Sequence, residues 1–349
     1  MNVTLTPEQR LLSETAAQIA DKVATVNPNE AELDLTLSPD VIDEQWTRVV
    51  ELGLPSLRVP GALGPEGSGV ETALCIEQFA RTLAAVPVVG QAAIVPELLA
   101  AANALDLLEA VAEGSLRLAP VFTADLQDFA GIESGAVCFD ASGATEALAV
   151  ERDGDIHRLI SLPLTGQPLQ ALDLTTSLVE LSVGDGVQVG EAIDRDRWDR
   201  AHALALTAIA ADLLGIMQGA LDDAVAYVGG RVQFGVAVGS FQAVQHLLAD
   251  ALVRVEGSRS CVWHAAWAVD QLPPSQALLA ARSAKAYAAA AGRDVVEASV
   301  QAFGGIAITW GHVSHVRLRR TLLDRRLLGD EITQYEEIAR LRLEDPEVT

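Results

Sequence analysis

The chain has 349 residues and a formal net charge of −24 at pH 7, because 48 acidic side chains outnumber 24 lysines and arginines. Such an excess of acid argues against nucleic acid or an anionic membrane as a partner. The length predicts two or three subdomains around a large core.

Half of the residues are hydrophobic, but charged residues interrupt the apolar runs, so we expect no membrane span. The first residues lack the pattern of a signal peptide. Cys75, Cys138 and Cys261 are too few and too far apart for a disulfide framework or a zinc knuckle. We therefore expect a cytoplasmic protein with reduced thiols.

Residues 1–114 have the apolar spacing of helices. In "TPEQ", Thr6 is placed as an N-cap and Gln9 as its partner in a capping box. "VIDEQWTRVVELGL" predicts a helix that stops at Gly53, and "VETALCIEQFARTLAAVP" predicts one that ends at Pro87. This region is predicted to be an N-terminal helical domain.

From 115 to 193 the pattern changes to short, β-branched, alternating stretches such as "LRLAPVF" and "GAVCFDAS". "RDGD" (152–155) and "GDG" (184–186) are typical of hairpin turns. We predict a small antiparallel β domain.

Residues 194–349 return to long apolar periodicity, which predicts a C-terminal four-helix bundle. "LPPS" and "FGGIAITWG" separate some of its helices. The predicted helices cover residues 197–229, 240–270, 275–299 and 312–342.

"RVQFGVAVGSFQ" (231–242) joins two of these helices. Arg231 offers a planar fork of donors that suits a phosphate, and the glycines beside it allow close backbone approach. The next helix begins near Ser240 and adds the positive end of its dipole. The alternative is that Arg231 merely caps the preceding helix and the glycines serve as turn residues. In the helix that follows, the periodicity predicts core-facing side chains at Phe241, Val244, Leu248 and Ala251.

"QAFGGIAITWGH" (301–312) is a second glycine-bearing turn, with Gln301 before the pair Gly304–Gly305. Such a pair can also be an ordinary helix C-cap. Both turns lie in the part of the chain that is nearly neutral: residues 201–349 carry 13 basic and 16 acidic side chains, against 11 and 32 before them. Together the turns favour a dinucleotide or another phosphate-bearing ligand. The histidines lack metal-ligand spacing, so we expect no metal site.

Over nearly its whole length the sequence resembles the acyl-CoA dehydrogenase family. "RVQFGVAVGSFQ" resembles the family's Arg-x-x-Phe-Gly…Phe-Gln pattern, and "QAFGG" its Gln-x-x-Gly-Gly pattern; residues 52–87 resemble its N-terminal loop and the helix after it. The resemblance implies a helical domain, a β domain and a four-helix bundle, in that order. It also implies that this chain contacts the pyrophosphate and adenine end of an FAD held mainly by a neighbouring subunit. The implied FAD contacts are Arg231, Gln233, Phe234, Phe241, Gln242, Gln301, Gly304 and Gly305.

The resemblance fails in the predicted β domain, which is shorter than the family's. The family's Thr-Glu…Gly-Ser and Gly-x-Lys-x-aromatic segments, beside the flavin ring and the thioester, are missing. The position of the family's usual base lies near Asp330 and Glu331, and a second family position holds Ala205. Gly311 stands where many related chains have Glu. No catalytic residue is therefore assigned.

These features predict a degenerate subunit of a heteromeric acyl-CoA dehydrogenase, like those of actinobacteria. Its expected cofactor is FAD, its substrate an acyl-CoA such as a steroid side-chain thioester, and its acceptor electron-transfer flavoprotein. Its expected partner is a second acyl-CoA dehydrogenase-like chain or another copy of itself. Three alternatives remain open: a self-sufficient homotetrameric dehydrogenase that uses Asp330, a flavin-dependent monooxygenase, and a structural partner without flavin.

Overall fold

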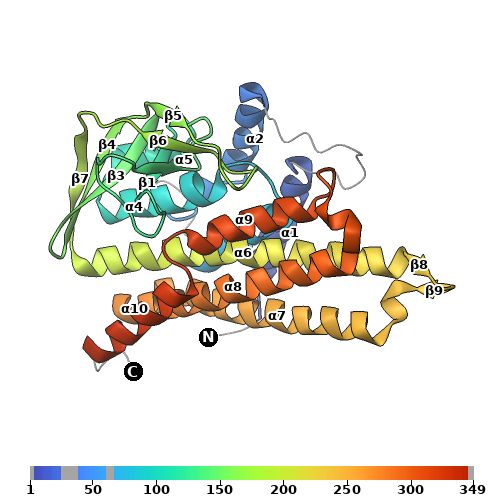
Figure 1. Ribbon diagram of the computed structural model, residues 1–349. Helices are drawn as coiled ribbons and strands as arrows, with labels where there is room; N and C mark the ends of the chain where they lie inside the picture. Colours follow the sequence, from blue (N-terminus) through green and yellow to red (C-terminus); the bar gives the residue numbers. More distant parts are fainter. Residues whose placement is uncertain (1–3, 25–37, 60–66, 345–349) are drawn as a thin grey trace.

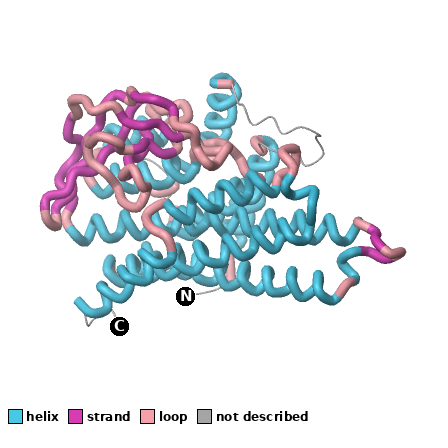
Figure 2. Tube along the Cα trace, in the orientation of Figure 1, coloured by secondary structure: helices cyan, strands magenta, loops and turns pink. Residues whose placement is uncertain are grey.

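The computed structural model describes residues 4–24, 38–59 and 67–344. Residues 60–66, part of the loop that resembles the family, lie outside the described residues. The chain begins with helices, passes through one twisted sheet and ends in long helices (Figures 1 and 2). The N-terminal helices are α1 (Pro7–Lys22), α2 (Pro39–Glu51), α3 (Gly69–Arg81), a π-helix (Val88–Ile94), α4 (Val95–Ala101) and α5 (Leu105–Ala112).

Local sequence signals explain most of these helix starts. The predicted capping box is confirmed, since the Thr6 hydroxyl accepts from the Gln9 amide N–H and the Gln9 side chain accepts from Thr6. Ser68 and Glu71 form a second box at α3. The prediction that this helix runs to Pro87 is wrong, because the backbone at Leu83 is left-handed, with φ 55°, and ends it earlier.

The middle of the chain forms one seven-stranded sheet, in the order β5-β6-β2-β1-β3-β4-β7, which lies to one side of the long helices (Figure 2). Its pairs are antiparallel except β1–β3, which is parallel. The predicted "RDGD" turn joins β3 to β4, whereas the predicted hairpin at "GDG" is wrong, because β6 pairs with β5 and β2 and β7 pairs with β4 across the sheet. The strands are β1 (Leu118–Phe122), β2 (Val137–Phe139), β3 (Glu146–Asp153), β4 (Ile156–Pro163), β5 (Gly166–Pro168), β6 (Leu178–Leu181) and β7 (Val187–Ile193).

The C-terminal helices are long and pack side by side (Figure 1). The first of them holds a stretch long and apolar enough to span a membrane, contrary to our expectation, but 94% of that stretch is buried within the molecule. It is therefore the central core helix. The helices are α6 (Arg195–Gly230), α7 (Gln242–Gln271), α8 (Pro274–Phe303), α9 (Ser314–Arg326) and α10 (Glu331–Glu344).

The predicted single helix over 312–342 is wrong, because the chain turns between α9 and α10. Leu328 and Gly329 have φ of 53° and 89°, which no helix accommodates. Lys285 of α8 is fully buried beneath the turn, and its ammonium donates to the carbonyls of Arg325 and Gly329. This buried contact fixes the direction in which α10 leaves the bundle.

Candidate functional site

The first glycine-bearing segment forms a small hairpin between α6 and α7. Its strands are β8 (Val232–Gln233) and β9 (Val236–Ala237), and both residues of the turn, Phe234 and Gly235, have positive φ. This is the two-residue turn that matches the twist of paired strands. The hairpin projects from the end of the helical bundle (Figure 1), and the Phe234 side chain is 94% exposed.

Arg231 has the capping role that was the alternative interpretation of the motif. Its amide N–H closes α6 by donating to the Tyr227 carbonyl. The guanidinium, however, extends over the Tyr227 ring, 5.5 Å from the ring centroid, and makes no ion pair within the described residues. The backbone role therefore leaves the charged end exposed and available to a ligand.

The structure brings the second glycine turn close to the first. The rings of Tyr227 and Phe303 lie 4.7 Å apart, so the aromatic contact that begins at Arg231 continues to the residue before Gly304. Gly304 combines φ 69° with ψ −143°, a conformation essentially restricted to glycine. Gln301 and Gly305 are exposed beside it.

Several glycines here have no internal reason to be glycine. A Cβ added at Gly229, Gly230 or Gly305 would meet nothing within 4 Å, and none of the three has a positive φ. By contrast, a Cβ at Gly215, in the buried part of α6, would lie 2.3 Å from the Glu77 carbonyl oxygen. Glycines that face open space suit the close approach of another molecule.

The remaining residues of the first motif are also exposed. Gln233 and Gln242 lie at the surface, and the start of α7 has no side-chain cap, so its amide groups keep their positive dipole end. The prediction that the apolar side chains at the start of α7 all face the core is wrong. Phe241 is exposed, edge-on to Phe234, and only Ala251 of the four is fully buried.

The acids nearest the family's base position already have other roles. Asp330 accepts from the amides of Ile332 and Thr333 and so caps α10; although partial burial raises its pKa, these hydrogen bonds hold it below the ordinary value. Glu331 is held by both donors of Arg325, which lower its pKa. Ala205 is buried and Gly311 exposed, and neither offers a titratable group.

A second region, at the junction of sheet and bundle, is filled by buried charged side chains. Arg320 of α9 donates to both carboxylate oxygens of Asp212, at 2.7 and 2.8 Å, and also to the Ala84 carbonyl and the Thr175 hydroxyl. Asp324 lies beside them, and burial, with the neighbouring Asp212, raises its pKa well above the ordinary value. These side chains are almost fully buried, and the hydrogen bonds within the chain use four of the five N–H donors of Arg320.

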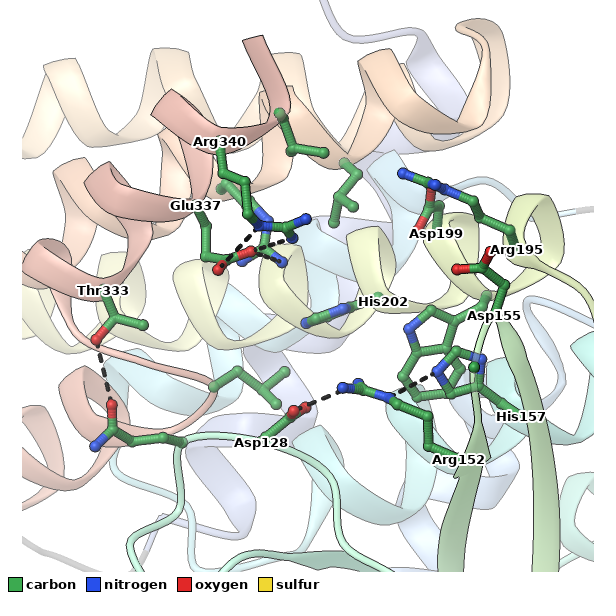
Figure 3. Close-up of a pocket in the computed structure, with 17 residues that line it drawn as sticks. Asp128, Arg152, Asp155, His157, Arg195, Asp199, His202, Thr333, Glu337 and Arg340 are labelled. Carbon is green, nitrogen blue, oxygen red and sulfur yellow. Dashed lines mark hydrogen bonds and ion pairs between the residues drawn. The ribbon is translucent and has the colours of Figure 1, made fainter. Parts of the chain in front are cut away.

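The same junction contains a cavity of about 510 Å³ that the motifs did not reveal (Figure 3). Four arginines and four carboxylates line it, together with His157 and His202. His157 stacks on Trp198 and accepts from Arg152, and burial lowers its pKa to about 4. The charged segments "ERDGDIHR" and "RDRWDRAH" contain many of these residues, but their convergence depends on the fold.

Comparison with known proteins finds matches to one family over most of the chain. A model of the acyl-CoA dehydrogenase N-terminal domain matches residues 6–104, and one of the C-terminal domain matches residues 205–342. Acyl-CoA dehydrogenase IpdE2 of Mycolicibacterium smegmatis is 29% identical over 93% of this chain and 96% of that protein.

Two solved structures of paired chains are also similar. A variant of the Tcur3481–Tcur3483 steroid ACAD superimposes with a TM-score of 0.81 at 25% identity, over 98% of this chain and 99% of that one. The ChsE4–ChsE5 complex of Mycobacterium tuberculosis superimposes with a TM-score of 0.77 at 22% identity, over 99% of both chains.

Proposed function

Because this chain belongs to the acyl-CoA dehydrogenase family, whose members are oxidoreductases acting on CH–CH bonds, we propose that it is one subunit of an FAD-dependent acyl-CoA dehydrogenase made of two unlike chains. Its part is to bind the pyrophosphate and adenine end of an FAD whose ring lies in the partner chain. The observation that carries this proposal is the exposed end of the bundle, where Arg231 has no ion pair within the described residues and nearby glycines face open space.

The residues present fit the phosphate end of FAD. Arg231 can donate to two phosphate oxygens at once, and the uncapped start of α7 adds amide donors of the same sign. Gly304 and Gly305 allow the ligand to lie against the backbone. A bound FAD would supply the acceptor for the hydride that leaves the β-carbon, and the reaction would also need a carboxylate to remove the α-proton.

The hydrogen bonds of the chain's own acids support the proposal that the catalytic base comes from the partner chain. Asp330 is engaged by two backbone amides and Glu331 by Arg325, so both are held as weak bases. We propose a bulky acyl-CoA, such as a steroid side-chain thioester, as the substrate, by analogy with the similar steroid ACAD, and electron-transfer flavoprotein as the acceptor.

The test is the visible flavin spectrum of the chain purified alone and after co-expression with a homologous acyl-CoA dehydrogenase chain. We expect colour only in the complex, at about one flavin per pair of chains. Arg231→Ala should weaken flavin retention about tenfold or more, because it removes charge-assisted hydrogen bonds to phosphate. Arg48→Ala, which removes an exposed arginine of α2, is the matched control.

The other outcomes select other functions. Stoichiometric flavin in the chain alone, with turnover abolished in Asp330→Asn, would establish a self-sufficient dehydrogenase. Asn at this position keeps the helix cap, so a loss of turnover could not be assigned to unfolding. A colourless complex would indicate a structural partner, and full flavin retention after Arg231→Ala would refute the contact we propose.

A further inference from the structure

The cavity at the junction of sheet and bundle is independent of the exposed bundle end. It lies between the β3–β4 hairpin and the helices α6, α8 and α10, at the opposite end of α6 from Arg231 (Figures 1 and 3). Its volume of about 510 Å³ is in the range of small-molecule sites.

Two buried polar atoms in this cavity have no hydrogen-bond partner within the described part of the chain. Arg282 is only 7% exposed, yet its Nε has no hydrogen-bond partner. The Nδ1 atom of His157, a residue that is 5% exposed, has no hydrogen-bond partner either. Buried polar groups are rarely left unpaired in native proteins, so these groups indicate a bound polar molecule.

Two charged side chains of the lining are also not paired with each other, so a ligand could pair with both. Arg282 of α8 and Asp199 of α6 both line the cavity, but no ion pair joins them in the part of the chain that the structure describes. Asp199 has only a distant partner, Arg195 at 3.8 Å, and Arg282 reaches Glu337 at 3.3 Å. Both ion pairs are longer than the 2.7–2.9 Å of a good charge-assisted hydrogen bond. Arg282 also donates through Nη1 to the Gln334 side-chain oxygen at 2.9 Å, so Nε is the donor that remains for a ligand.

We propose that the cavity binds a free α-amino acid with an apolar side chain, with its carboxylate at Arg282 and its ammonium group at Asp199. The four arginines and four carboxylates of the lining balance, which favours a ligand without net charge. Leu278, Leu328 and Leu341 supply an apolar wall for the side chain.

Electrostatics explain why one ligand must carry both charges. Burial raises the pKa of Asp199 and lowers that of Arg282, so each charged form lacks adequate solvation. An ammonium group at Asp199 and a carboxylate at Arg282 would compensate both. A ligand with a single charge would leave the other buried group uncompensated.

The test is calorimetric titration of the full-length chain with L-leucine, N-acetyl-L-leucine and L-leucinamide. The last two lack the ammonium group and the carboxylate respectively. We expect L-leucine to bind about tenfold or more tightly than either analogue, since each analogue loses a charged hydrogen bond. Equal binding of the three, or no binding of L-leucine at about 10 mM, would overturn the proposal.

Two variants locate the ligand, and melting curves check that each remains folded. Asp199→Asn should abolish the preference for L-leucine over N-acetyl-L-leucine, and Arg282→Gln the preference over L-leucinamide. Asp294→Asn, a half-buried acid of α8 outside the cavity lining, is the matched control and should keep both preferences. Flavin content, measured on the same variants, should not change, so the two proposals fail separately.

Discussion

The C-terminal end and the middle of the central helix α6 lie in opposite environments. At its C-terminal end, Arg231 and the glycines around it face open space. In the middle of the same helix, Asp212 is held by Arg320 in a buried network with Asp324 and Thr175. The C-terminal end therefore stays exposed, as the proposed FAD contact requires, while the chain's own side chains fill the space around Asp212.

This difference fits the proposal that the chain keeps the family's fold while a partner supplies part of the chemistry. A bundle end that contacts a ligand held elsewhere needs only a few exposed residues. Around Asp212, by contrast, a buried ion pair with Arg320 joins the bundle to the rest of the molecule. Substitutions in the two regions should therefore differ in their effects on the free energy of unfolding and on flavin content.

The largest effect is expected at the junction. Arg320→Met removes the one cation that pairs with Asp212 among the described residues and leaves buried carboxylates uncompensated. Breaking a buried pair in this way costs about 3–5 kcal/mol in the free energy of unfolding. Urea unfolding should measure this loss against that of Arg48→Ala, a substitution that removes an ion pair worth less than about 1 kcal/mol. Equal losses in the two variants would mean that the network is not structurally important.

A second effect at the junction depends on pH. Asp140 is buried, its carboxylate accepts from the Gly90 amide at 2.7 Å, and burial raises its pKa to about 7. A pKa raised by folding gives stability that is fully present below the unfolded value near 4 and is lost as pH rises through about 7. The native protein should therefore lose about 2–3 kcal/mol from this group between pH 5 and pH 8.

Asp140→Asn should flatten that dependence. Asparagine tolerates the positive φ of 55° at this position and cannot ionise. Urea unfolding at pH 5 and pH 8 should give the variant a higher free energy of unfolding than the native protein at pH 8. An identical pH dependence in both proteins would contradict the burial argument.

The comparison also separates what a sequence reveals from what it hides. Thr6–Gln9 and the "RDGD" turn act within a few residues, so their patterns predicted them. The two glycine motifs were recognisable for the same reason. Arg320 and Asp212 are 108 positions apart and meet only because α9 crosses α6, so no local pattern announces them. The turn at Leu328 escaped prediction because a non-glycine residue there adopts a left-handed conformation that the buried Lys285 supports.

The smallest effect is expected at the exposed end, and it separates stability from function. Gly229→Ala places a methyl group in open space on a helix, so the isolated chain should gain about 0.5–1 kcal/mol in its free energy of unfolding. Gly215→Ala, the matched change in the same helix, should instead destabilise it, because the methyl group would overlap the Glu77 carbonyl oxygen. If a ligand approaches this backbone closely, the more stable Gly229→Ala chain should retain less flavin in its complex. Unchanged flavin would mean that no ligand comes within contact of α6 at this point, and the proposed FAD contact would then rest on Arg231, the start of α7 and the second glycine turn.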